Sequence, residues 1–289
     1  MSRATAVLPP TLITDQSLRE WLIEDIGRGD RATQSILAPG DKPQQAEWIV
    51  KEAGIIAGLP IALRVFPILD PFASYTVTVT EGQWCERGQV IAQITGSLDA
   101  LLTGERVALN LAMRLSGIAT ATYSYVAAIA DLPTKLVDTR KTTPGLRIFE
   151  KYASRVGGAI NHRMGLDDGV MLKDNHIVAV GNIREAVKQT RSQIPYPLTI
   201  EVETENLEQV EEVLSQDEVD IIMLDNMPIE TMREAIHRIR RLRPTLKVEA
   251  SGNITLETIR SVAETGVDFI STSAPITRSS WLDLSMKLR

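Results

Sequence analysis

From residue 134 onward, short apolar strand patterns alternate with amphipathic helix patterns, and this alternation constrains the fold more than any other feature. Asn182 stands three residues before Glu185, and Asn206 stands three before Gln209, which is the capping-box spacing of a helix start. Repeated βα units with apolar strands predict a parallel sheet covered by helices, and we favour a barrel. The predicted strands are 135–138, 170–173, 198–203, 220–225, 247–251 and 268–271.

The first part of the chain mixes helix and strand without this regular alternation. Apolar residues at helical spacing predict a short amphipathic helix over 17–26, and residues 75–79 form a β-rich run. Glycine-punctuated strands follow over 82–96, and a long helix is predicted over 103–125, interrupted at Gly117. Because the pattern changes between residues 110 and 135, we expect two domains.

Composition excludes several classes of protein. The chain has 289 residues, a net charge of −6 and 4% aromatic residues, which argues against a nucleic-acid surface. Cys85 is the only cysteine, so an internal disulfide and a cysteine-based metal site are excluded, and a reducing compartment fits. The N-terminal residues lack the apolar region of a signal peptide, and the uncharged stretch 115–130 is too short and polar to span a bilayer. We therefore expect a cytoplasmic enzyme that binds neither membranes nor nucleic acids.

Almost every predicted strand ends in polar or charged residues. In a parallel barrel, the C-terminal ends of the strands meet at one mouth, where functional groups gather. One polar strand end is explained by the chain leaving the core, but six in succession make that explanation insufficient. The residues at these ends are Asp138, Thr139, Arg140, Lys141, Lys173, Asp174, Asn175, Glu203, Asp225, Asn226, Ser251, Gly252, Asn253, Ser271, Thr272 and Ser273.

A cationic cluster lies in this part of an otherwise acidic chain, formed by Arg140, Lys141, His162, Arg163 and Lys173. Guanidinium groups hold planar carboxylates or phosphates in bidentate fashion, while lysine supplies a compact charge. Lys173 follows an apolar strand, where an ammonium group without a partner is costly. We therefore expect the cluster to bind a small polyanion rather than to form a solvated basic face.

Acidic and hydroxyl-bearing residues complete the predicted site. Glu203 and Asp225 could hold Mg²⁺, directly or through water, or could accept hydrogen bonds from sugar hydroxyls. Hydroxyls and backbone N–H groups near Ser251 and Ser271 could bind a phosphate ester, as barrel phosphate sites do late in the strand order. The residues alone predict a barrel enzyme for an anionic, phosphorylated substrate, working with Mg²⁺.

Two segments, DTRKTTPGLR at 138–147 and KYASRVGGAINHRMGLDDGVMLKDNHI at 151–177, closely resemble the quinolinate phosphoribosyltransferases, which are type II phosphoribosyltransferases. The resemblance runs through most of the chain, and its segments stand in the family's order. The further matching segments are 24–30, 88–96, 105–120, 200–209, 221–226, 249–255 and 266–271.

This resemblance implies a reaction and a fold. The reaction converts quinolinate and 5-phosphoribosyl 1-pyrophosphate (PRPP), with Mg²⁺, into nicotinate mononucleotide, pyrophosphate and CO₂, a step in NAD biosynthesis. The implied fold joins an N-terminal α/β sandwich domain, residues 1–115 with the tail 275–289, to an open α/β barrel over 116–274. The resemblance also implies a homodimer or dimer-based oligomer, in which Arg106 reaches into the neighbouring subunit's site.

Individual roles follow from the matching positions. The resemblance places Arg140, His162 and Arg163 around the two carboxylates of quinolinate. It places Lys141 and Lys173, with Thr142 beside them, near the PRPP phosphates and the reacting centre, and Glu203 and Asp225 near the ribose hydroxyls and metal. We choose Glu203 over Glu201, which shares its face of the strand. The implied 5′-phosphate loops are Ser251, Gly252 and Asn253, and Ser271, Thr272 and Ser273.

Two positions depart from the family pattern. Many relatives have glycine where this chain has Ala159 and Ser273. The added methyl or hydroxymethyl group leaves less room for a ligand to approach the backbone closely, which argues against a direct phosphate contact from the Ser273 backbone. Neither change removes a charged group.

Other functions compete with this interpretation. The related type II enzymes are nicotinate phosphoribosyltransferase and a molybdenum-transport-associated homologue that shares the TRKTTPG segment. A barrel aldolase would use Lys173 as a Schiff-base nucleophile. The strands over 79–96 are typical of lipoyl or biotinyl carriers, although they offer no lysine at a plausible turn.

Overall fold

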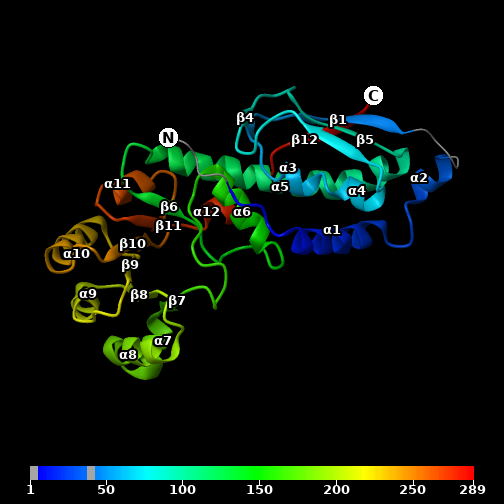
Figure 1. The fold of residues 1–289 in the computed structure, drawn as a ribbon. Helices are drawn as coiled ribbons and strands as arrows, with labels where there is room; N and C mark the ends of the chain where they lie inside the picture. Colours follow the sequence, from blue (N-terminus) through cyan, green and yellow to red (C-terminus); the bar gives the residue numbers. More distant parts are fainter. Residues whose placement is uncertain (1–5, 38–42) are drawn as a thin grey trace. The chain divides into compact units, whose positions relative to one another are not determined.

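The computed structural model describes residues 6–37 and 43–289, and Figure 1 shows the order of their elements. The first five residues, on which part of the signal-peptide prediction falls, lie outside that range. The chain divides into two compact units within the long helix α5 (Leu98–Ala128). The N-terminal unit reaches Tyr123 and includes 143–158 and 278–289, and the barrel unit comprises 124–142 and 159–277.

An antiparallel sheet of four strands, in the order β12-β1-β5-β3, forms the centre of the N-terminal unit. The last strand of the chain belongs to it, because Val50 on β1 pairs with Leu284 on β12. Alternate residues of β1, Ala46 and Trp48 among them, are fully buried, as expected for a strand with one covered face. The elements are α1 (Thr11–Ile26), α2 (Arg31–Ile36), β1 (Gln44–Val50), β2 (Gly54–Ile55), α3 (Leu59–Ala62), α4 (Val65–Leu69), β3 (Ser74–Val77), β4 (Trp84–Cys85), β5 (Val90–Gly96), α6 (Arg147–Gly157) and β12 (Leu284–Leu288).

Helix α5 is continuous over 31 residues, so the predicted interruption at Gly117 is wrong. Gly117 permits a close approach instead: a Cβ atom there would lie 1.9 Å from the carbonyl oxygen of Ser280. Even with this length, no helix among the described residues is both long and apolar enough to cross a membrane.

The segment 143–158 belongs to the N-terminal unit, whereas the boundaries predicted from the sequence, 115/116 and 274/275, include it in the barrel. Polar contacts explain this membership. The carboxylate of Glu150, which is fully buried, accepts hydrogen bonds from Arg114 Nη2 at 2.7 Å and from the Thr143 hydroxyl at 2.8 Å. The Tyr152 hydroxyl donates to Glu81 at 2.8 Å.

The barrel unit contains a parallel sheet of six strands in the order β6-β11-β10-β9-β8-β7. The edges β6 and β7 are not paired with each other, so the barrel is open, which confirms the predicted fold class. Every predicted strand is present, with ends displaced by no more than two residues. The elements are β6 (Lys135–Val137), β7 (Val170–Leu172), α7 (Asp174–Val180), α8 (Ile183–Gln193), β8 (Ile200–Thr204), α9 (Leu207–Leu214), β9 (Ile221–Asp225), α10 (Ile229–Leu242), β10 (Lys247–Ser251), α11 (Ile259–Ala263), β11 (Phe269–Ser271) and α12 (Ala274–Thr277).

Alternate residues of each barrel strand face different surroundings. Ile200 and Val202 of β8 join the apolar core that the strands form with the helices, whereas Glu201 and Glu203 lie on the opposite face of the strand. The predicted helix caps are confirmed. The Asn182 side chain accepts a hydrogen bond from the Glu185 N–H at 2.8 Å, and the Asn206 side chain accepts one from Gln209 at 2.9 Å.

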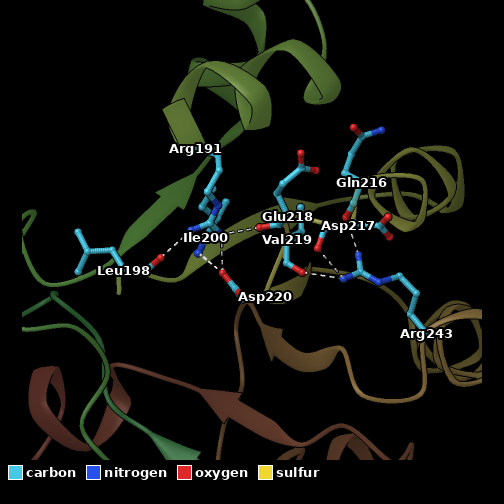
Figure 2. Close-up of polar contacts among 9 residues, drawn as sticks. All are labelled: Arg191, Leu198, Ile200, Gln216, Asp217, Glu218, Val219, Asp220 and Arg243. Atoms are coloured by element: carbon cyan, nitrogen blue, oxygen red, sulfur yellow. Dashed lines mark hydrogen bonds and ion pairs between the residues drawn. The ribbon is translucent and has the colours of Figure 1, made fainter. Parts of the chain in front are cut away.

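Figure 2 shows the edge at which β8 and β9 begin, where Arg191 of α8 ties the strands together. Its guanidinium donates to the carbonyl oxygens of Leu198 and Glu218, at 2.9 and 2.6 Å, and to the Asp220 carboxylate at 2.8 Å. The same carboxylate accepts the backbone N–H of Ile200 at 2.8 Å. Charge and hydrogen-bonding capacity are therefore matched at this edge.

Two further arginines work in the same way. Arg243 donates to three carbonyl oxygens of the 216–219 loop, at 2.6, 3.3 and 2.9 Å (Figure 2). Arg240 donates to the Asp268 carboxylate at 2.7 Å, and that carboxylate also accepts the backbone N–H of Val248 at 2.8 Å. The N-terminal edge of the barrel strands thus serves the stability of the fold.

Candidate active site

A cavity of about 440 Å³ opens at the C-terminal ends of the barrel strands. Most of the predicted site residues line it: Arg140, Lys141, His162, Arg163, Lys173, Glu203, Asp225, Ser251, Gly252, Asn253 and Ser271. Further lining residues are Asp138, Thr139, Met171, Met223, Asn226 and Glu249. The parallel strands therefore bring together, from widely separated parts of the chain, the groups that the sequence marks at strand ends.

Two guanidinium groups dominate the cationic part of the wall. Arg140 Nε is buried and has no hydrogen-bond partner. Arg163 donates to the carbonyl oxygen of Gly169 at 2.8 Å. Burial and the positive charge of Arg140 lower the pKa of Arg163, while the negative charge of Glu201 acts in the opposite direction. A bound anion would supply the missing acceptor and relieve the repulsion between the two cations.

The buried carboxylate of Asp138, at the end of β6, orders the segment that carries His162. It accepts hydrogen bonds from Asn161 Nδ2 at 2.6 Å and from the His162 backbone N–H at 2.8 Å. The next residue, Thr139, accepts the backbone N–H of Lys141 through its hydroxyl at 3.0 Å. The polar end of β6 therefore fixes two neighbouring parts of the wall.

Lys173 differs from its sequence-based description. Its side chain is 46% exposed and its ammonium group lies 3.0 Å from a Glu203 carboxylate oxygen, so it is neither desolvated nor without a partner. The error arises because Lys173 follows β7, which has only three residues, and already lies outside the sheet. His176 supports this turn, because its Nδ1 accepts the backbone N–H of Lys173 at 3.0 Å.

The loops after β9 and β10 have strained backbone conformations. Among the described residues, Asn226 and Asn253 are the two non-glycine residues with positive φ, at 53° and 49°. Gly252, with φ of 100°, lies against Asn226, because a Cβ atom there would stand 2.2 Å from Asn226 Oδ1. Strain that the surroundings maintain is typical of ligand-binding loops.

A pair of buried carboxylates, Glu201 and Glu249, lies beside His162, and Glu249 lines the cavity. They are 3% and 2% exposed, and one oxygen of each, Oε1, has no hydrogen-bond partner. His162 Nε2 lies 3.0 Å from Glu201 Oε2 and 3.6 Å from Glu249 Oε2. Burial and the charge of Glu201 raise the pKa of Glu249 to about 8.

Sequence reasoning missed Glu249 and set Glu201 aside in favour of Glu203. The available signal was strand periodicity, because Glu249 alternates with the buried Val248 and Ala250 and therefore faces the barrel interior. A carboxylate at an interior position of a core strand is costly unless it is paired or protonated, so an acidic residue there indicates a specific partner.

Oxygen ligands for a hard cation are present at the rim. One carboxylate oxygen from each of Glu203, Glu205 and Asp225 lies within 4.8 Å of the other two. Carboxylates are the ligands that Mg²⁺ prefers, usually together with water and substrate phosphates. The residues present therefore fit a bound Mg²⁺.

Several predicted residues do not line the cavity. Arg106 is exposed on α5, in the N-terminal unit. Thr142 is absent from the wall, and the Thr272 hydroxyl donates to the carbonyl oxygen of Ile254 at 3.0 Å. Ser273 directly precedes α12, and its carbonyl oxygen accepts a hydrogen bond from the backbone N–H of Thr277 in that helix. Ala159, one of the two departures from the family pattern, packs its methyl group into the barrel core.

Comparison with known proteins agrees with this site. The sequence matches the family models of the quinolinate phosphoribosyl transferase N-terminal domain over residues 30–116 and C-terminal domain over 118–287. A probable nicotinate-nucleotide pyrophosphorylase (carboxylating) of Synechocystis sp. is 59% identical over 281 residues, 97% of this chain and 94% of the relative. The Bacillus subtilis protein of the same name is 45% identical, covering 93% and 91%.

Solved structures show the same architecture. NadC from Streptococcus pyogenes has a TM-score of 0.91 at 41% identity, with 98% of each chain covered. The nicotinate-nucleotide pyrophosphorylase from Francisella tularensis has a TM-score of 0.91 at 36% identity, with 99% of each chain covered. With both domain models matched and relatives aligned over nearly the whole length, this chain belongs to the quinolinate phosphoribosyl transferase family.

Proposed function

We propose that this protein transfers the phosphoribosyl group of PRPP to quinolinate and decarboxylates the product, yielding nicotinate mononucleotide, pyrophosphate and CO₂ for NAD biosynthesis. The observation that carries the proposal is the guanidinium pair of Arg140 and Arg163 in the cavity, with Arg140 Nε buried and without an acceptor. A planar dicarboxylate supplies acceptors for both groups. The buried thiol of Cys85 supports a reducing compartment such as the cytoplasm.

The chemistry requires little proton transfer from the protein. The pyridine nitrogen attacks C1 of the ribose while the bond from C1 to the pyrophosphate oxygen breaks. The resulting pyridinium ring accepts the electron pair that the adjacent carboxylate leaves behind as CO₂, and that ring carbon then takes a proton. In this scheme Arg140 and Arg163 orient the ring, and Lys141 and Lys173 balance the charge of the phosphates, so positioning and electrostatics provide the catalysis.

Mg²⁺ is part of the proposal. Glu203 and Asp225 would hold it, partly through water, with Glu205 beside them, because their oxygens cluster at the rim. When bound, the ion would help to neutralise the pyrophosphate leaving group. Glu203 already pairs with Lys173 at 3.0 Å, so the same carboxylate would also orient that ammonium group.

We further propose a homodimer in which Arg106 of one subunit completes the site of the other. The exposure of Arg106 beside a cavity of about 430 Å³ in the N-terminal unit supports this arrangement. Mixing inactive Arg106→Ala protein with inactive Lys173→Ala protein tests it. Statistical exchange of subunits restores about one quarter of the sites, because each mixed dimer has one intact site. Activity that stays absent after proven exchange contradicts the shared site.

The remaining positions of the proposed 5′-phosphate site are Ser251, Gly252, Asn253 and Ser271, with Thr272 and Ser273 behind them. Strained loop geometry at Gly252 and Asn253 supports a close backbone approach by a phosphate ester. Thr142 follows Lys141 directly, and its backbone N–H donates to the Arg140 carbonyl at 3.0 Å. This hydrogen bond supports a role for Thr142 in shaping the turn that carries both cations.

A rival proposal has nicotinate, a monocarboxylate, as the substrate. A second guanidinium beside the first favours the dicarboxylate, because Arg140 and Arg163 repel each other and two carboxylates would offset both charges. The aldolase alternative is disfavoured, since the ammonium group of Lys173 is exposed and ion-paired, whereas a Schiff-base lysine needs a lowered pKa.

The test is an assay with quinolinate, PRPP and Mg²⁺ that follows nicotinate mononucleotide and CO₂ together, with nicotinate as a parallel substrate. We expect one CO₂ for each mononucleotide formed from quinolinate. Turnover of nicotinate without release of CO₂ would replace the dicarboxylate proposal with its rival, and silence with both substrates would overturn the function.

A further inference from the structure

The family resemblance places His162 at the substrate carboxylates, but both of its ring nitrogens have partners in the protein. Nδ1 accepts the backbone N–H of Arg163 at 2.8 Å, so this nitrogen carries no proton. Nε2 lies 3.0 Å from Glu201 Oε2, a distance that fits a hydrogen bond donated by the ring. Together these contacts assign His162 as the neutral tautomer with its proton on Nε2.

The same contacts argue against a metal ion between His162, Glu201 and Glu249, although these three side chains lie close enough to hold one. A histidine that binds a metal through Nε2 donates its Nδ1–H to a neighbouring acceptor. Here Nδ1 faces a donor, so metal binding at Nε2 would leave both ring nitrogens without a proton.

The carboxylates beneath the ring cannot both carry a charge at little cost. Glu201 and Glu249 are almost fully buried, and each keeps one oxygen without a partner. The groups around Glu249 are Glu201 on β8, Asp138 at the end of β6, Ser271 on β11 and the ring of His162, whose charge, if the ring were protonated, would lower the pKa of Glu249. With the His162 ring neutral, the charges that remain beside Glu249 are those of Glu201 and Asp138, both negative, so a proton retained by Glu249 removes a large repulsion.

We propose that Glu249 is a positioning residue that keeps a proton and, with Glu201, turns the Nε2–H of His162 away from the substrate, leaving carboxylate recognition to Arg140 and Arg163. This inference rests on the proposed function only for its consequence in catalysis. With one proton retained, a single negative charge lies behind the binding site of a dianionic substrate. Loss of that proton places a second negative charge there and weakens binding.

Nitrogen NMR of the histidine rings tests the tautomer without any assay. The chain has three histidines, so ring-labelled protein gives a simple spectrum, and His176→Gln and His237→Gln variants assign it by loss of one signal each. We expect the His162 ring to carry its proton on Nε2 near pH 7, with and without quinolinate. An imidazolium form, or a proton on Nδ1, overturns the proposal even if the enzyme proves to have another substrate.

Steady-state kinetics of Glu249→Gln test the retained proton. With a pKa of about 8, the protonated fraction of Glu249 falls from about nine-tenths at pH 7 to about one-tenth at pH 9. We therefore expect the KM for quinolinate of the wild type to rise about tenfold over this range, while the KM for PRPP changes much less. The amide stays neutral, so Glu249→Gln loses this rise. A variant that keeps the tenfold rise contradicts the role of Glu249.

Glu81 provides the matched control, since it is a half-buried carboxylate whose pKa is also raised by desolvation. Its two oxygens are satisfied by the backbone N–H groups of Gly58 and Leu59 and by the Tyr152 hydroxyl. Glu81→Gln should leave both the His162 ring signals and the pH dependence of the quinolinate KM as in the wild type. A change in either equal to that of Glu249→Gln would mean that the effects report a general loss of packing.

Discussion

The two ends of the barrel strands contain the same kinds of charged residue, but these differ in whether their polar atoms have hydrogen-bond partners. At the N-terminal edge, the guanidinium groups of Arg191 and Arg243 are matched with carbonyl and carboxylate oxygens (Figure 2). At the C-terminal end, Arg140 Nε, Glu201 Oε1 and Glu249 Oε1 are buried and have no hydrogen-bond partner. One edge stabilises the fold, and the other keeps hydrogen-bonding capacity for a ligand.

This difference explains why charge alone is a poor guide to function. Arginine, aspartate and glutamate occur at both ends. A charged group whose hydrogen bonds are satisfied within the protein contributes stability, whereas a buried group without a partner costs free energy unless a ligand binds to it. We therefore expect substitutions at the C-terminal end to lower activity and substitutions at the N-terminal edge to lower stability.

The largest expected effect is at the C-terminal end. Arg140→Ala should lower kcat/KM for quinolinate by about 10²–10³-fold, or about 3–4 kcal/mol, because it removes a preorganised donor. The free energy of unfolding should not fall, since the repulsion with Arg163 is relieved. Titration calorimetry should find PRPP binding retained and quinolinate binding lost, and the reverse pattern contradicts the assignment.

The strained loop should show the next effect. Gly252→Ala forces a side chain into positive φ and against Asn226 Oδ1, so we expect a loss of about 1–3 kcal/mol in PRPP binding or stability. Gly181→Ala is the control, because its φ is also positive, at 112°, but nothing lies within 4 Å of the added carbon. Equal KM values for PRPP in the two variants would show that the crowding at Gly252 is unimportant.

At the N-terminal edge the expected effect is on stability alone. Arg191→Ala removes three donated hydrogen bonds, two of them to carbonyl oxygens, and should lower the free energy of unfolding by about 1–2 kcal/mol in urea titrations. Its kcat/KM should match the wild type. Arg233→Ala, which removes an exposed pair 3.8 Å from Glu230, should change neither quantity. A loss of activity in Arg191→Ala would break the separation of the two ends.

The smallest effect concerns the acid limb of stability. Burial raises the pKa of Asp268, but the hydrogen bonds from Arg240 and Val248 and the charges of Arg240 and Lys247 outweigh it, so the pKa is lowered. Its contribution is therefore present above about pH 4 and is lost as the pH falls through the lower folded value. Asp268→Asn should cost about 1 kcal/mol or less at pH 7 and should flatten the loss of stability below pH 4.

The sign is opposite at Glu249. Its raised pKa means that the folded protein holds a proton that the unfolded chain releases, so this group lowers the free energy of unfolding as the pH rises from 4.5 to about 8. Thermal unfolding of Glu249→Gln across this range should lack that decline. If the stability of the variant fell with pH as steeply as that of the wild type, the proton taken up on folding would not be on Glu249.

Strand periodicity and strand-end polarity predicted much of this molecule. They located the six barrel strands, and with the resemblance they marked the cations that line the cavity. Both signals are local in sequence, which is why they work without knowledge of the tertiary structure. Helix caps such as Asn182 are predictable for the same reason.

What escaped prediction depends on distant neighbours. The sequence alone suggests that Gly117 breaks the helix. In the structure the helix continues, and glycine is needed there because the Ser280 carbonyl, distant in sequence, packs against it. Residues 143–158 join the N-terminal unit, where Glu150 meets Arg114. In the sequence, Glu249 is a single acidic residue among apolar ones. Its significance depends on Glu201 of β8 and on His162, which only the fold brings close to it.

We propose that the guanidinium pair of Arg140 and Arg163, with Arg140 Nε buried and without an acceptor, selects a dicarboxylate. The ratio of kcat/KM for quinolinate to that for nicotinate, measured in the wild type and in Arg140→Ala, tests it most directly. We expect a strong preference for quinolinate in the wild type and a ratio that collapses in the variant through loss of quinolinate use. Comparable use of both substrates by the wild type, or a ratio that Arg140→Ala leaves unchanged, would contradict it.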